Sequence, residues 1–79
     1  MAQARKKVPN DPRKQFGLRV VALRKARDWS QEQLSLESGL ARSYLGGVER
    51  GQRNIALLNI CRLARALGEP PSELLKFTE

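Results

Sequence analysis

At 79 residues the chain has room for one domain, near the lower size limit for folding without disulfides or metal ions. It has no histidine, scattered carboxylates and no phosphate-binding glycine loop, which leaves no basis for an enzyme or for a metal or cofactor site. Its single cysteine cannot form an internal disulfide, and no apolar run is long enough to span a membrane. Fifteen lysines and arginines against eight acidic residues give a formal net charge of +7, which favours a polyanionic partner, with solubility alone as the alternative explanation.

Residues 1–12 are polar and basic and are interrupted by Pro9 and Pro12. This composition is typical of a flexible basic N-terminal arm, followed by a folded domain over residues 13–79. Such an arm either reaches DNA or remains a solvated tail.

A first helix is expected over residues 13–27. Its inward face carries Phe16, Val20, Leu23 and Arg24 at helical spacing, with Val21 and Ala22 beside them. Trp29 follows the helix, and we expect it to pack onto the core; a platform for stacking bases is the second option.

The second helix is expected to begin after Ser30, which has the pattern of an N-cap, with Gln33 completing a capping box. It carries Leu34 and Leu36 and ends at Ser38. Gly39 then supplies the left-handed turn residue that a side chain would resist.

The third helix is expected over residues 42–50, closed by Gly51. Leu45 and Val48 are three residues apart and should face inward, together with Leu40. The opposite face then carries Arg42, Ser43, Gly46 and Gly47. This face is polar at its start and has no side chains at the two glycines. The two glycines indicate either a weak or tightly packed helix or, as we favour, a backbone that approaches DNA closely.

Two short helices joined by a tight glycine turn form a helix-turn-helix, whose second helix can lie in a DNA major groove. The strong positive charge agrees with that arrangement. The sequence therefore predicts binding to double-stranded DNA.

A fourth helix is expected over residues 57–67, stopped by Gly68 and started by Ala56, which is a poor cap. Its apolar stripe comprises Leu57, Ile60, Leu63, Ala64 and Leu67. Cys61 lies between apolar neighbours, so we expect a buried thiol in a reducing, cytoplasmic setting. A secretory signal is not evident, which agrees with that location.

A short fifth helix is expected over residues 71–77, with proline at its start. Apolar residues crowd this segment beyond what a small core can cover. We expect the surplus to form a homodimer interface, with crowding against the parent core as the alternative. The predicted interface residues are Leu58, Leu74, Leu75 and Phe77.

The chain from residue 16 to residue 75 resembles the phage-repressor (lambda-repressor-like) helix-turn-helix family, which implies an all-α, compact five-helix DNA-binding domain whose helices 2 and 3 form the motif. Residues 42–55, RSYLGGVERGQRNI, are most similar to the restriction–modification controller proteins, small homodimeric transcription regulators. The residues that carry the family resemblance are Ser30, Gln31, Gln33, Leu34, Ser38, Gly39, Leu40, Tyr44, Leu45, Val48, Glu49, Arg50, Gly51, Ala64, Leu67, Gly68, Ser72, Glu73, Leu74 and Leu75.

The resemblance implies a role for each matching position. Gly46 differs from the serine that controller proteins more often have, which puts a contact there in doubt. Gln31 is implied to bind phosphate, although ordinary helix filling is the alternative. The implied DNA base contacts are Arg42, Ser43 and Tyr44, to which the side-chain-free part of the third helix adds Gly46 and Gly47. The implied phosphate contacts are Gln31, Arg50, Arg53 and Asn54. The implied structural ion pair is Arg24 with Glu49.

An arginine presents two donors that match guanine O6 and N7, which independently favours Arg42 as a base-reading residue. We therefore expect a homodimeric transcriptional regulator on a roughly palindromic operator, with RNA polymerase as a further contact if it activates. An antitoxin or phage-type repressor with a protein partner is the alternative within DNA binding. A protein-interaction module is the alternative outside it, and RNA binding lacks a stacking surface.

Overall fold

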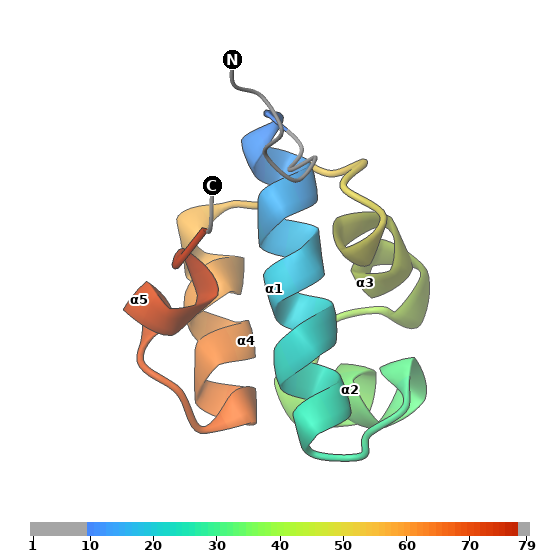
Figure 1. Cartoon of the computed structure of the whole chain (residues 1–79). Coiled ribbons are helices and arrows are strands. Elements are labelled where there is room, and N and C mark those ends of the chain that lie inside the picture. Colours follow the sequence, from blue (N-terminus) through green and yellow to red (C-terminus); the bar gives the residue numbers. More distant parts are fainter. Residues whose placement is uncertain (1–9, 78–79) are drawn as a thin grey trace.

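The computed structural model describes residues 10–77, and that part of the chain contains five helices and no strand. Helix α1 runs along the middle of the molecule, with α4 and α5 on one side and α3 on the other (Figure 1). Helix α2 packs against both α3 and α4. The helices span Pro12–Ala26 (α1), Gln31–Ser38 (α2), Arg42–Glu49 (α3), Leu57–Leu67 (α4) and Pro71–Leu74 (α5). The predicted all-α five-helix class is confirmed.

Helix α1 begins one residue earlier than predicted, at Pro12, because Asp11 caps it. The Asp11 carboxylate accepts a hydrogen bond from the backbone N–H of Arg13 at 2.9 Å and forms an ion pair with the Arg13 guanidinium. The side-chain hydrogen bond from Arg13 lowers the pKa of Asp11 to about 2. Proline suits the first helical position because its missing N–H would have no partner there. The rest of the predicted arm, residues 1–9, lies outside the described residues.

Local signals fix both ends of α2. The Ser30 hydroxyl accepts from the backbone N–H of Gln33 at 3.0 Å, and Gly39 adopts φ 78° after the last helical residue. The capping box is only half formed, since the Gln33 side chain donates to Glu37 instead of returning to Ser30. One serine and one glycine are therefore sufficient to delimit this helix.

The core lies where α1, α3 and α4 converge on α2 and α5. The predicted inward positions Leu40, Leu45 and Val48 are buried, and Trp29 packs against the core as expected. The buried apolar residues are Phe16, Val20, Leu34, Leu40, Leu45, Val48, Leu63, Ala64, Leu67 and Leu74.

Three expectations for the C-terminal half are wrong. Leu57 is 72% exposed instead of joining the stripe of α4, because it occupies the first helical position, a turn before the core begins at Ile60. Cys61 is a free thiol that is only half-buried. Helix α5 is shorter than predicted and ends at Leu74.

Leu74 is fully buried and is therefore not an interface residue of the folded protomer. Leu74 packs into the core cluster, and Phe77 packs partly against it as well. Arg19 on α1 holds the same segment, since its guanidinium donates to the Glu73 carbonyl at 2.8 Å and to the Glu73 carboxylate at 3.0 Å. Of the predicted interface residues, Leu58 and Leu75 are the exposed ones.

Candidate nucleic-acid interface

Helices α2 and α3 form the predicted helix-turn-helix. The turn between them is held by two serines: Ser35 donates to the Leu40 carbonyl at 2.5 Å, and Ser38 accepts from the Leu40 N–H at 3.2 Å. The N-cap of α3, Ala41, provides no side-chain hydrogen bond. The first backbone N–H groups of α3 thus keep their capacity to bind an anionic group.

One face of α3 fixes the helix in the protein and the other faces outward. Leu45 and Val48 are buried in the core, whereas Arg42 and Ser43 at the start of the helix are exposed. The two residues predicted to read bases at this end are therefore accessible to a ligand.

Gly46 and Gly47 are buried rather than bare, contrary to the sequence expectation. Arginine side chains cover them: a Cβ built at Gly46 would lie 3.2 Å from Nη1 of both Arg42 and Arg50. A Cβ at Gly47 would lie 3.1 Å from Cγ and Nε of Arg53. The outer face of α3 is consequently a layer of arginine side chains.

Neighbouring residues hold two of these arginines in place. Arg50 Nε donates to Gln52 at 3.2 Å, and the Arg53 guanidinium lies over the Tyr44 ring, 5.3 Å from its centroid. The Tyr44 hydroxyl in turn accepts from Asn59 on α4 at 3.3 Å. The roles of Gln52 and Asn59 were missed, and Asn59 could not be linked to Tyr44 by any local pattern because fifteen residues separate them.

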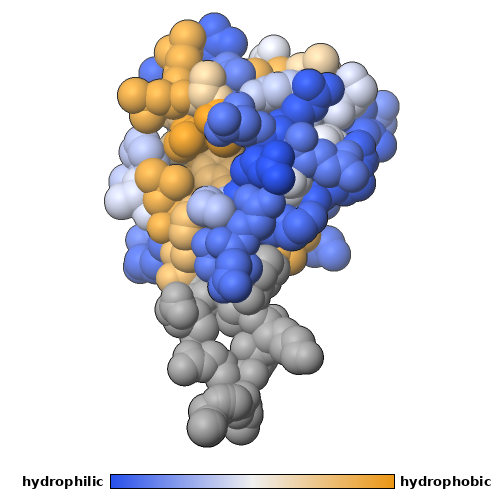
Figure 2. All heavy atoms as spheres, turned by 90° about the horizontal axis from the view of Figure 1, so that it is seen from above, coloured by the Kyte–Doolittle hydropathy of each residue, from blue (hydrophilic) through white to orange (hydrophobic). Residues whose placement is uncertain are grey.

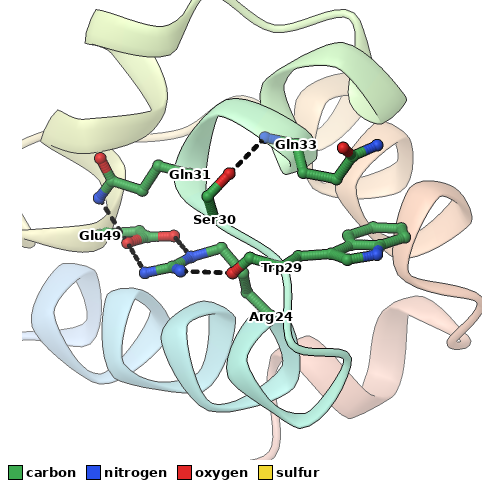
Figure 3. Close-up of polar contacts among 6 residues, drawn as sticks. All are labelled: Arg24, Trp29, Ser30, Gln31, Gln33 and Glu49. Carbon is green, nitrogen blue, oxygen red and sulfur yellow. Dashed lines mark hydrogen bonds and ion pairs between the residues drawn. The ribbon is translucent and has the colours of Figure 1, made fainter.

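The ion pair implied for Arg24 and Glu49 is present and joins α1 to α3 (Figure 3). Arg24 also donates to the Trp29 carbonyl at 2.8 Å. Gln31, at the start of α2, donates its amide to Glu49 at 2.6 Å. One N–H of this amide is thus engaged within the protein, and the implied phosphate contact of Gln31 stays a prediction that rests on the second N–H.

Arg42, Arg50 and Arg53 take part in none of the four ion pairs found among residues 10–77. Their charge is therefore not offset by a neighbouring carboxylate. Viewed from above, one side of the molecule is strongly hydrophilic and the opposite side is apolar (Figure 2). Asn54, the remaining predicted phosphate contact, is exposed beside Arg53.

Large apolar side chains near the C-terminal half are also exposed: Leu57, Leu58 and Leu75 are 72%, 63% and 47% exposed. Leu75 borders a hollow of about 160 Å³, which the sequence did not reveal. It is lined by Pro12, Arg13, Phe16, Arg53, Asn54, Ile55, Ile60, Leu75 and Phe77.

No helix within residues 10–77 is long and apolar enough to cross a membrane. The same range contains no group of three or more side chains arranged to hold a metal ion.

A helix-turn-helix family model matches residues 20–74. Control protein C.BamHI of Bacillus amyloliquefaciens is 43% identical over 70 residues, covering 87% of this chain and 86% of that protein. Control protein C.SmaI of Serratia marcescens is 45% identical over 56 residues, covering 71% and 67%. The crystal structure of the restriction-modification controller protein C.AhdI from Aeromonas hydrophila matches with a TM-score of 0.77 at 56% identity, covering 78% of this chain and 94% of that one.

Proposed function

Because this chain belongs to the helix-turn-helix family and is similar to restriction–modification controller proteins, we propose that it is a DNA-binding transcriptional regulator of that kind. It acts as a homodimer on a specific operator, without enzymatic activity and in the cytoplasm. The observation that carries the proposal is the layer of Arg42, Arg50 and Arg53 on the outer face of α3.

In this proposal α3 enters the major groove with its N-terminal end toward the bases. Arg42 reads guanine through two donors, and Ser43 bonds a base edge or a phosphate. Arg50, Arg53 and Asn54 bind the sugar–phosphate backbone and thereby set the register of the protein on the duplex. Tyr44 helps to position Arg53 through a cation–π contact, since the Arg53 guanidinium lies over the Tyr44 ring.

The dimer is proposed to form through the apolar side of the molecule. Leu58 and Leu75 expose large apolar surfaces, and the apolar part of the hollow that Leu75 borders can accept an apolar side chain from a second copy. A two-fold dimer places the two α3 helices about 34 Å apart, so that the half-sites lie one helical turn apart.

Selection of bound sequences from a random pool of duplexes tests this function directly. The expected result is a roughly palindromic site with half-sites about 10 base pairs apart, retained against competitor DNA at physiological salt. A protein that enriches no sequence and forms no competitor-resistant complex would be a protein-interaction module with incidental affinity for DNA.

A further inference from the structure

We propose that Gly46 and Gly47 are positioning residues. Because they have no side chains, the arginines of the interface can pack directly against the backbone of α3. Gly46 positions Arg42 and Arg50 and so influences base preference, whereas Gly47 positions Arg53 and so influences backbone binding. This inference rests on the proposed function, because it concerns how the same interface presents its charges.

The geometry at Gly46 carries the first part. Arg42 lies four residues before Gly46 and Arg50 four residues after it, and both side chains fold back over the glycine from opposite ends of the helix. Each Nη1 atom is 3.2 Å from the point that a Cβ would occupy. That separation is tighter than ordinary van der Waals contact, so a side chain there requires both guanidinium groups to shift by a few tenths of an ångström.

Two like charges over one residue repel each other unless an acceptor or anion lies between them. The Gln31 side-chain oxygen is 3.8 Å from the same Cβ point and is the nearest acceptor of α2. Glu49 orients that oxygen by accepting the amide of the same side chain. The two arginines therefore favour an incoming group with acceptor atoms, such as guanine O6 and N7.

Gly47 has a different neighbour. The Arg53 stem lies over Gly47 while its guanidinium lies over the Tyr44 ring, and Asn59 fixes the Tyr44 hydroxyl. A Cβ at Gly47 would meet Arg53 at 3.1 Å, so the Arg53 side chain would have to shift by a few tenths of an ångström.

Glycine in a helix interior is destabilising relative to alanine, and α3 has two in succession. At both positions a Cβ would meet side-chain atoms of arginine, which can move at little cost, and no backbone of another element. Alanine would therefore fit the fold and strengthen the helix. Alanine would, however, remove the close packing of the arginine side chains against the helix backbone.

The test compares G46A with G47A, each serving as the matched control for the other. Both variants should melt about 4 to 8 °C above the parent, since each gains helix propensity. On the operator selected by the parent protein, G46A should lose about tenfold in affinity, lose less on unrelated DNA, and select a different base at one position of each half-site. G47A should lose affinity for operator and unrelated DNA by similar factors.

A second measurement needs no DNA. In the free protein, the NMR signals of the arginine Nε–H groups should shift for Arg42 and Arg50 in G46A, and for Arg53 in G47A. A G46A protein with parental arginine signals, or with parental operator affinity and base preference, overturns the inference. A parent protein that selects no DNA sequence contradicts both the proposed function and the role of Gly46 in base preference. In that case the NMR comparison still decides whether the glycines position the arginine side chains.

Discussion

Arg24 and Glu49 are joined by two hydrogen bonds, from Nε to Oε2 at 2.7 Å and from Nη2 to Oε1 at 2.9 Å, with side chains only 11% and 4% exposed. Arg24→Ala would leave a buried carboxylate without its cation. We expect the free energy of unfolding, measured by urea denaturation, to fall by about 3 to 5 kcal/mol. That is a large share of the stability of a small domain.

Lys76→Ala is the control for this change, because it also breaks an ion pair. Lys76 pairs with Glu73 at 3.0 Å, but its side chain is 65% exposed. Solvent screening should limit its effect to about 1 kcal/mol or less. An Arg24→Ala protein as stable as Lys76→Ala would contradict the structural role of the buried pair.

Gly17 marks the closest approach of α1 to α3. A Cβ there would lie 2.6 Å from the backbone carbonyl oxygens of both Val48 and Glu49. Gly17→Ala should therefore lower the free energy of unfolding by about 1 to 3 kcal/mol, although alanine favours the helix itself. Thermal unfolding followed by circular dichroism measures the effect. A variant that melts at or above the parent temperature would show that the two helices are not so closely packed.

Signals close in sequence predicted the helix-turn-helix correctly. Ser30 and Gly39 delimit α2 through a hydrogen bond and a left-handed turn that involve only nearby residues. The apolar spacing of Ile60, Leu63 and Leu67 likewise predicted the buried side of α4. Such features depend on the local backbone, so the sequence is sufficient to locate them.

Features that depend on how helices meet were not predictable in this way. Periodicity assigns a helix face to each residue but does not say where the core ends. For this reason Leu57, expected in the apolar stripe, is exposed, and Leu74, expected at an interface, is buried. The contact at Gly17 requires the placement of α1 against α3. The cover over Gly46 depends on arginine side chains that arrive from both ends of α3.

The cap of α1 should depend on pH. The pKa of Asp11 is lowered from 3.8 to about 2 by the hydrogen bond from Arg13, so folding favours the ionised carboxylate. Its contribution is complete above the unfolded value and is lost as the pH falls through about 2. The difference in melting temperature between the parent and Asp11→Asn should be constant above about pH 5 and shrink toward pH 2. A difference that stays constant down to pH 2 would contradict the lowered pKa.

Arg42 and Arg53 should differ in what they contribute to DNA binding. Arg42→Ala should cost about 1 to 3 kcal/mol on the selected operator and relax the preference at one base pair of each half-site. Arg53→Ala should weaken binding to all sequences similarly and reduce the salt slope by about one. Titrations at several salt concentrations on operator and unrelated duplexes separate the two. An Arg42→Ala loss that is equal on both duplexes would remove its base-reading role.

Leu58, one of the exposed leucines of α4, tests the dimer. Leu58→Lys would place a cation from each protomer in an apolar interface, where burying an unpaired charge is costly. The mass by light scattering should fall from twice 8.9 kDa to 8.9 kDa, and operator affinity should fall by at least about tenfold because the half-sites are then bound separately. Leu36→Lys is the matched control, since Leu36 is 76% exposed but lies on α2. It should leave the dimer intact, and because Leu58 is 63% exposed, Leu58→Lys should still fold. A Leu58→Lys protein that remains dimeric would place the interface elsewhere on the molecule.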